Sequence, residues 1–293
     1  MKVLVTGFKG QLGYDVVNEL EKRRYTAVGV DIDDMDITDA ASVRAVMKKV
    51  NPDAVIHCAA WTAVDLAEDE DKIDKVRAVN ATGTENIAKV CKELDCKMIY
   101  ISTDYVFNGE GTHFWEPDET NYQPLNIYGQ TKYEGELAVR SNLEKYFIVR
   151  IAWVFGINGK NFIKTMLNLG KSKDKITVVC DQIGSPTYTY DLARLLVDMV
   201  ETNKYGMYHA TNEGICSWYE FAREIFRQAA AMGRKEYDEE HLSVFPVTAD
   251  NYPTKAKRPS NSRLSKEKLS ANGFDRLPTW QDALGRYLKE IEF

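Results

Sequence analysis

A tyrosine and a lysine in the middle of the chain have the spacing of an acid–base pair. In Tyr128-Gly-Gln-Thr-Lys132 the two side chains are four residues apart, so they share one face if this segment is helical. A phenol, with a pKa of about 10, is a poor acid–base group at pH 7, and a nearby ammonium lowers that pKa by stabilising the phenolate. The same spacing also occurs in exposed pairs that have no function. Thr103 favours chemistry here, because it follows a predicted strand and its hydroxyl could hydrogen-bond the same reacting oxygen.

A glycine-rich turn near the N-terminus has the spacing of a dinucleotide-binding loop. In GFKGQLG, Gly7, Gly10 and Gly13 lie between a predicted strand and a predicted helix, and Gln11 and Leu12 separate the last two glycines. Glycines at such positions allow the tight turn, the close approach of the backbone to a pyrophosphate and the packing of the helix on the sheet. The helix N-terminus adds unpaired N–H groups for the phosphates. We therefore expect these five residues to bind a dinucleotide, with a purely structural turn as the alternative.

Two charged residues give opposite indications about the 2′ position of that dinucleotide. Asp31 ends the second predicted strand, eighteen residues after Gly13. A carboxylate there accepts the ribose 2′-hydroxyl of NAD and repels the 2′-phosphate of NADP. Lys9, directly before the second glycine, could offset this repulsion. Both NADPH and NADH are therefore expected as cofactors, and the positions of Asp36 and Ile37 suggest that they flank the adenine.

The spacing of apolar residues predicts the elements that position these side chains. Over residues 1–155 it predicts strands at 3–6, 27–30, 54–58, 98–102 and 147–152, and helices at 11–23, 39–50, 76–94 and 130–141. The strands are continuously apolar rather than alternating, which is typical of a parallel sheet covered on both faces. We predict an α/β fold, with a Rossmann-type doubly wound parallel sheet as the dinucleotide-binding domain at 1–155.

The second half of the chain has a looser pattern. Helices are expected at 161–170, 191–202 and 217–232, and short strands at 176–179 and 207–210. Residues 246–263 contain three prolines and several polar residues, which indicates a loop or an ordered polar lid over a site. We predict a smaller, mixed substrate domain at 156–293, which could be interleaved with the first.

Composition excludes several classes of protein. Lys and Arg number 38 and Asp and Glu 44, so the formal charge is −6, and the pI of about 5.4 does not suit binding to nucleic acid or to an anionic membrane. No apolar run reaches the roughly 18 residues that span a bilayer. The five cysteines contain no C-x-x-C pair, and the four histidines have no metal-ligand spacing. We expect a cytoplasmic protein with free thiols and no metal site.

Nine segments, in order along nearly the whole chain, carry a resemblance to one enzyme family. The chain resembles the extended short-chain dehydrogenase/reductase superfamily and, within it, the dTDP-4-dehydrorhamnose reductase family. The matching segments are GFKGQLG (7–13), CAAWTAVDLAE (58–68), NATGT (80–84), STDYVFNG (102–109), PLNIYGQTK (124–132), RIAWVFG (150–156), NFIKTML (161–167), DQIGSPT (181–187) and YPTKAKRPSNSRL (252–264).

The resemblance implies a reaction and assigns roles to the acid–base residues. The reaction is the reduction of the C4 keto group of dTDP-4-dehydro-L-rhamnose to dTDP-L-rhamnose by NADPH or NADH. Tyr128 would donate a proton to the developing alkoxide, and Lys132 would lower the pKa of Tyr128 and hold the nicotinamide ribose. Thr103, in place of the usual serine, would bond the sugar oxygen, with Asp104 beside it.

The resemblance also implies contacts with the cofactor and the substrate outside this group. Ala60, Trp61 and Thr62 match the loop that lines the cofactor, and Trp153 matches a tryptophan that contacts the substrate, with a core tryptophan as the alternative. Because a nucleoside diphosphate carries about two negative charges, an arginine is expected to clamp it. Arg258 is the first candidate, with Lys255 and Lys257 as further candidates, and a solvated basic loop is the alternative.

Two other functions are compatible with these residues. One is a different short-chain enzyme acting on a sugar nucleotide, such as a 4,6-dehydratase, an epimerase or a different 4-keto reductase. A dehydratase would carry an acidic pair after the threonine, whereas Tyr105 follows Asp104 here. The other is a non-catalytic nucleotide-binding regulator, as in the regulatory subunit of methionine adenosyltransferase. The residues leave open whether the protein is a monomer or a homodimer.

Overall fold

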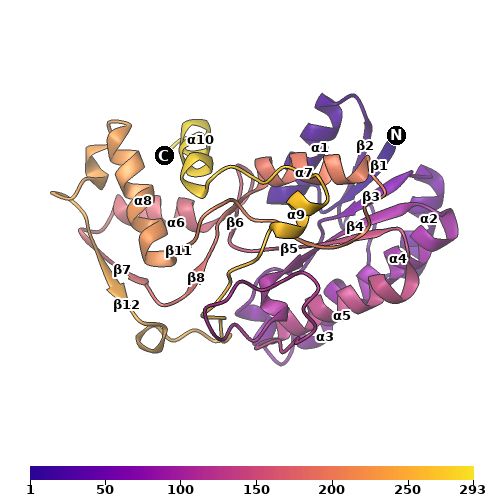
Figure 1. Cartoon of the computed structure of the whole chain (residues 1–293), viewed down its shortest axis with the longest axis horizontal. Coiled ribbons are helices and arrows are strands. Elements are labelled where there is room, and N and C mark those ends of the chain that lie inside the picture. Colours follow the sequence, from indigo (N-terminus) through magenta and orange to yellow (C-terminus); the bar gives the residue numbers. More distant parts are fainter.

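A six-stranded parallel sheet forms the centre of the molecule (Figure 1). The computed structural model describes residues 1–293, and the strand order is β10-β5-β4-β3-β1-β2. The strands are β1 (Lys2–Thr6), β2 (Thr26–Val30), β3 (Ala54–His57), β4 (Lys97–Thr103), β5 (Tyr146–Ile151) and β10 (Gly206–His209). This parallel sheet, with helices on both faces, confirms the predicted α/β fold class.

The continuous apolar runs of the strands fill two separate cores, one on each face of the sheet. Side chains point to opposite faces alternately along a strand. In β1, Val3 and Val5 therefore face one core, and Leu4 faces the other; all three are fully buried. A strand that is buried on both sides cannot show a polar–apolar alternation.

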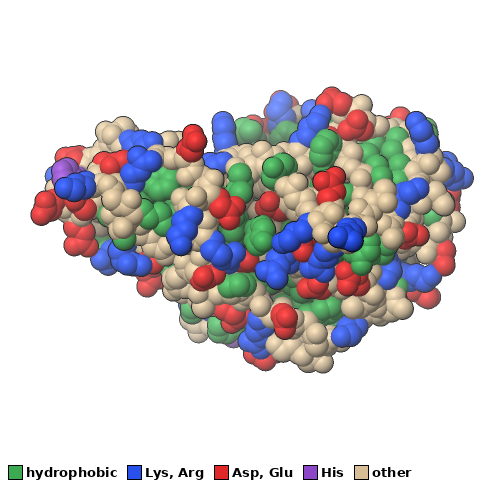
Figure 2. All heavy atoms as spheres, turned by 90° about the horizontal axis from the view of Figure 1, so that it is seen from above, with side chains coloured by type: hydrophobic (Ala, Val, Ile, Leu, Met, Phe, Trp, Pro, Cys, Tyr) green, Lys and Arg blue, Asp and Glu red, His purple; other side chains and the backbone are tan.

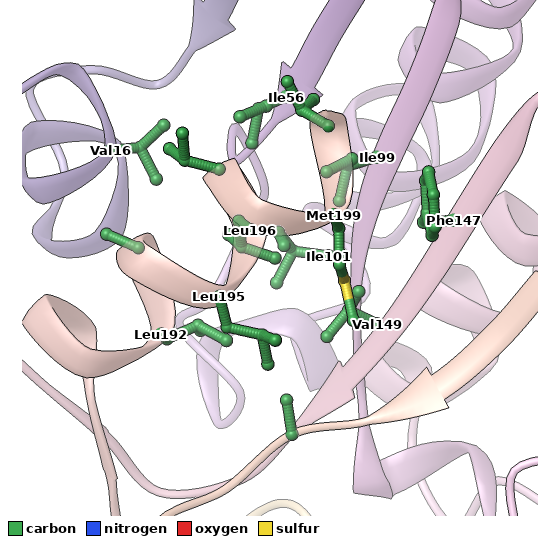
Figure 3. Close-up of a cluster of buried hydrophobic side chains, with 14 of the residues drawn as sticks. Val16, Ile56, Ile99, Ile101, Phe147, Val149, Leu192, Leu195, Leu196 and Met199 are labelled. Carbon is green, nitrogen blue, oxygen red and sulfur yellow. The ribbon is translucent and has the colours of Figure 1, made fainter. Parts of the chain in front are cut away.

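Helices from distant parts of the sequence cover the sheet. On one face lie α1 (Gln11–Lys22) and α7 (Thr189–Val200), and Figure 3 shows Leu192, Leu196 and Met199 of α7 packed towards strand residues such as Ile99 and Val149. On the other face lie α2 (Ala40–Val50), α4 (Gly83–Leu94) and α5 (Ile127–Asn142).

The second half of the chain therefore contributes directly to the sheet. The predicted strand at 207–210 is β10, which pairs in parallel with β5. The helices α7 and α9 (Glu267–Ala271) pack against the sheet, and α9 contacts β10. The helix predicted over 76–94 is also more complex than expected. It comprises α3 (Ile73–Arg77), a π-helical turn η2 (Ala78–Thr82) and α4.

The remaining elements form a smaller layer around a third core (Figure 1). Its helices are α6 (Phe162–Gly170), α8 (Trp218–Ala231) and α10 (Trp280–Glu290). Its short strands are β6 (Val154–Phe155), β7 (Lys175–Val179), β8 (Ile183–Gly184), β9 (Thr187–Tyr188), β11 (Cys216–Ser217) and β12 (Ser243–Val247). Short 3-10 turns lie at Leu66–Glu68, Asp104–Val106, Lys235–Tyr237 and Ala249–Asn251.

One segment expected as a loop begins in a strand. Residues 246 and 247 belong to β12, which pairs in parallel with β7. Pro246 favoured the prediction of a loop. Proline is nevertheless tolerated in a strand at the edge of a sheet, and both strands of a two-stranded sheet lie at an edge.

Positively and negatively charged side chains are intermixed on the face of the molecule seen from above. In the view of Figure 2, lysine and arginine side chains are interspersed with aspartate and glutamate over the visible face. None of the helices combines the length and apolar character needed to cross a bilayer.

Candidate active site

A cavity of about 860 Å³ lies at the carboxyl edge of the sheet. Parallel α/β sheets place ligand sites there, because the loops that follow the strands meet at this edge. Most of the residues that the sequence analysis singled out line the cavity: Gly7, Gly10, Gln11, Leu12, Gly13, Asp31, Asp36, Ile37, Ala60, Thr62, Thr103, Asp104, Tyr128, Lys132 and Trp153. Trp61 and Arg258 do not line it.

The glycine turn has the shape of a phosphate-binding loop. Gly7 has a φ of +65°, which favours glycine, and a Cβ on Gly13 would lie 2.3 Å from the Gly7 carbonyl oxygen. Gly10 caps α1 without any side-chain hydrogen bond to the first turn. The N–H groups of that turn are therefore available to an anion, and the turn fits the diphosphate of a dinucleotide.

Gln11 connects this turn with the second half of the chain. Its Oε1 accepts hydrogen bonds from the backbone N–H of Gly156 (3.0 Å) and from Nδ2 of Asn161 (3.2 Å). Nδ2 of Asn158 donates to the Lys9 carbonyl oxygen at 2.6 Å. The loop after β6 is thereby fixed against the glycine turn.

The side chains of Asp31 and Lys9, which are expected near the 2′ position of the cofactor, do not pair with each other. The Asp31 carboxylate accepts from the backbone N–H groups of Ile32 (2.9 Å) and Lys9 (3.3 Å). The Lys9 ammonium instead pairs with Asp33 at 2.9 Å, and both of these side chains are exposed. The charge of Lys9 is therefore partly neutralised before any cofactor binds.

The N-terminus of α5 brings Tyr128 to the cavity. The Asn126 side chain caps this helix by accepting from the backbone N–H of Gly129 at 2.8 Å. The helix starts at residue 127, three residues earlier than predicted, because this cap lies before Tyr128. Gly129 permits a close approach, since a Cβ there would lie 2.3 Å from the Tyr105 carbonyl oxygen.

Lys132 lies one turn further along α5 and is almost fully buried, with 3% exposed. Its ammonium donates to the Ile101 carbonyl oxygen at 2.7 Å and lies 4.2 Å from the centre of the Tyr100 ring. The predicted helical face of Tyr128 and Lys132 is thus formed, and β4 provides the surface against which Lys132 is held.

The pKa of the tyrosine shifts in the opposite direction to the one expected. Burial raises the pKa of Tyr128 to about 12; the hydrogen bond with Thr103 opposes this rise, and the Asp104 carboxylate adds to it. Burial lowers the pKa of Lys132 to about 7, against the opposing effect of the Glu136 carboxylate. With a pKa of about 12, Tyr128 keeps its proton at neutral pH.

Two tryptophans form one wall of the cavity. Trp153 follows β5 with a φ of +50°, an uncommon backbone conformation for a large side chain. Its ring stacks on that of Trp218, with centroids 3.8 Å apart and planes at 15°. Trp153 lines the cavity, is only half-buried and also packs against buried apolar side chains, so it contributes both to the cavity wall and to the core.

Trp218 and Lys160 also line the cavity, and sequence reasoning missed both. Each lies in the second half of the chain, far in sequence from the glycine turn and from Tyr128. Neither belongs to a motif with a chemical spacing, so only tertiary packing reveals them.

Trp61 and Arg258 lie outside the cavity lining for identifiable reasons. Trp61 is held by Asn80, whose Oδ1 accepts from the Trp61 backbone N–H at 2.8 Å, and its indole donates to the Ala63 carbonyl oxygen. Arg258 donates to both carboxylate oxygens of Asp65, at 2.6 and 3.2 Å.

Comparison with known proteins identifies the family of this chain. The family described as "RmlD substrate binding domain" matches residues 1–293, the whole chain. The chain belongs to the RmlD substrate-binding-domain family.

Several known proteins match nearly the whole chain. The spore coat polysaccharide biosynthesis protein SpsK of Bacillus subtilis is 38% identical over 289 residues, which is 99% of this chain and 97% of that protein. The dTDP-4-dehydrorhamnose reductase of Aggregatibacter actinomycetemcomitans is 38% identical over 291 residues, 97% of each chain. The crystal structure of the Bacillus anthracis dTDP-4-dehydrorhamnose reductase in complex with NADP is 40% identical, with a TM-score of 0.92 and 99% of each chain covered.

Proposed function

We propose that the protein reduces the C4 keto group of dTDP-4-dehydro-L-rhamnose to give dTDP-L-rhamnose, with NADPH or NADH as the reductant. One observation carries the proposal: a single cavity joins the glycine turn at one end to Thr103, Tyr128 and Lys132 at the other. The family supports the substrate, since relatives named dTDP-4-dehydrorhamnose reductase match nearly the whole chain.

Tyr128 has the properties of a proton donor in this reaction. A bound nicotinamide supplies the hydride that reduces the keto carbon. Because its pKa is raised to about 12, Tyr128 holds its proton at neutral pH and can give it to the oxygen that becomes negative. When protonated, Lys132, held by the Ile101 carbonyl oxygen, has two further N–H donors for the nicotinamide ribose.

The substrate would lie between the catalytic hydroxyls and the two tryptophans. The stacked rings of Trp153 and Trp218 offer an apolar face to the sugar and exclude water on that side. Arg258 is proposed to contact the diphosphate of the substrate with those of its five N–H donors that Asp65 leaves free.

A spectrophotometric assay tests the proposal. Purified protein is mixed with NADPH or NADH and dTDP-4-dehydro-L-rhamnose, and the loss of reduced-nicotinamide absorbance is followed. Tyr128→Phe removes only the hydroxyl, so we expect kcat to fall by about 10²- to 10⁴-fold while cofactor affinity stays the same. Undiminished turnover in Tyr128→Phe would exclude Tyr128 as the proton donor.

The same experiment separates the other candidate functions. Tight cofactor binding without turnover would favour a nucleotide-binding regulator, and turnover of a different nucleotide sugar would favour another short-chain enzyme. We further propose that the protein works in the cytoplasm, which its five free cysteines support because free thiols are typical of a reducing compartment.

A further inference from the structure

The cations that line the cavity are three lysines, and the protein itself engages two of them. The Lys9 ammonium pairs with Asp33 at 2.9 Å, and the Lys132 ammonium donates to the Ile101 carbonyl oxygen at 2.7 Å. The third is Lys160, whose side chain is exposed and makes no hydrogen bond or ion pair with the rest of the chain. Its ammonium is therefore free for an anionic ligand in the cavity.

The neighbours of Lys160 in the sequence place it beside the glycine turn. A Cβ on Gly159 would lie 3.4 Å from Cγ of Gln11, and Nδ2 of Asn161 donates to Oε1 of Gln11 at 3.2 Å. Gln11 is the first residue of α1, so its backbone N–H is one of those that the helix leaves unpaired. Lys160 is thus attached, through the residues on both sides of it, to the helix end that fits a diphosphate.

The loop that carries Lys160 is held in place by further hydrogen bonds. Nδ2 of Asn158 donates to the Lys9 carbonyl oxygen at 2.6 Å. From α6, the Lys164 ammonium donates to the carbonyl oxygens of Ile157 (2.5 Å) and Gly159 (2.9 Å). A charge on a loop fixed in this way is positioned before a ligand binds, which reduces the entropy lost on binding.

The charges at the glycine turn leave a bound diphosphate incompletely compensated without Lys160. A diphosphate carries about two negative charges, whereas the N-terminus of a helix supplies only about half a positive charge. The carboxylates of Asp31 and Asp36 also line the cavity and add negative charge. A cation from another part of the chain is therefore needed, and Lys160 is the one without a partner.

We propose that Lys160 binds the diphosphate of the dinucleotide cofactor, together with the backbone N–H groups at the N-terminus of α1. The inference deepens the proposed function and rests on its dinucleotide cofactor. Lysine suits this role, because its compact charge on a flexible stem can follow a phosphate oxygen. Residues 156–293 then contribute to the affinity for the cofactor as well as to the substrate site.

The test is the binding of NADPH and NADH to the wild type, Lys160→Met and Lys160→Arg, measured by calorimetric titration. Methionine keeps an unbranched side chain and removes the charge, so the Kd of both cofactors should rise by about five- to tenfold. The two factors should be equal, because both cofactors carry the diphosphate and only NADPH carries the 2′-phosphate. Lys160→Arg keeps the charge and should retain most of the affinity.

A matched variant and a change of salt identify the charge as the cause. Lys171→Met removes the same charge from an exposed lysine at the end of α6, outside the cavity lining, and should leave both Kd values unchanged. The difference between Lys160→Met and the wild type should shrink at high salt, since salt screens exposed charges. The thermal midpoint of Lys160→Met should equal that of the wild type, because the side chain makes no contact that stabilises the fold.

Three results would overturn the inference. The first is an unchanged Kd for both cofactors in Lys160→Met, and the second is a rise for NADPH alone, which would assign Lys160 to the 2′-phosphate. The third is weaker binding of dTDP with unchanged binding of both cofactors, which would assign it to the diphosphate of the substrate. A wild-type protein that binds NADPH without reducing the keto sugar would contradict the proposed reaction, and the binding titrations would still decide the role of Lys160.

Discussion

At the residue scale, we propose that the charges of Asp31 and Lys9 determine which form of the cofactor the protein prefers. The Asp31 carboxylate at the end of β2 is fixed by two backbone N–H groups, so it cannot turn away from an incoming ribose. Lys9, the only cation expected to compensate it, is engaged with Asp33. A bound 2′-phosphate would therefore lie near the fixed negative charge of Asp31. The nearby Lys9 ammonium is already paired with Asp33.

Replacing Asp31 should shift the cofactor preference towards NADPH. In Asp31→Asn the shape is kept and the repulsion is lost, so we expect the ratio of kcat/KM for NADPH to that for NADH to rise by about five- to tenfold. Asp33→Asn should give a smaller rise, because it only frees the Lys9 ammonium. Asp71→Asn changes the same charge at an exposed site outside the cavity lining and should leave the ratio unaltered. Equal ratios in all three variants would contradict this account.

At the scale of elements, the helix α5 connects the acid–base pair with the C-terminal segment. Asn126 uses its carbonyl oxygen to cap the helix and its Nδ2 to donate to the Lys257 carbonyl oxygen at 2.8 Å. Further along the helix, Glu136 pairs with the fully buried Arg150 at 2.7 Å, and this pair anchors α5 to β5. The two contacts fix both the start and the middle of the helix that carries Tyr128 and Lys132.

Removing the side-chain cap of α5 should lower the stability of the protein. Asn126→Ala should lower the free energy of unfolding by about 1 to 2 kcal/mol, because the first turn loses its acceptor and the Lys257 carbonyl loses its donor. A decrease of about 2 to 4 °C in the thermal midpoint, measured by calorimetry, is expected for a chain of this size. Ser141→Ala, an exposed position near the end of the same helix, should change the midpoint by less than about 1 °C. A midpoint in Asn126→Ala equal to that of the wild type would show that the cap contributes nothing.

The whole molecule is held together by segments that cross between the two halves of the sequence. The strand β10 extends the central sheet beside β5, and α7 supplies many of the apolar side chains of the core shown in Figure 3. In the other direction, the loop after β3 binds the segment 255–258 through the Asp65–Arg258 and Asp69–Lys255 pairs. We propose that residues 1–155 and residues 156–293 have different functions but fold together as one unit.

A fragment of residues 1–155 should therefore fail to fold alone. Without α7 and β10, the part of one apolar face of the sheet that α7 covers and the edge of β5 would be exposed to water, which favours aggregation. We expect neither a cooperative thermal transition nor near-ultraviolet circular dichroism for this fragment. Co-expression with residues 156–293 should restore a soluble complex that binds NADPH. Cooperative unfolding of the isolated fragment 1–155 would show instead that it is an autonomous domain.

The amino-acid sequence by itself determined the parallel α/β fold and the local constellations of the site. The glycine turn, the Tyr128–Lys132 pair and Asp31 are recognisable because their chemistry depends on spacing within one element or one turn. Continuous apolar strands likewise identify a sheet that is buried on both faces. These features are local, so the sequence contains them in full.

Only the tertiary structure decided which distant residues complete the site and how their protons behave. Trp218 and Ser262 reach Trp153 and Asp104 across large separations in the chain, and no spacing rule connects them. The pKa of Tyr128 rises instead of falling, because burial outweighs the hydrogen bond with Thr103 that opposes the rise. Desolvation depends on all the atoms packed around a group, and that packing exists only after the chain has folded.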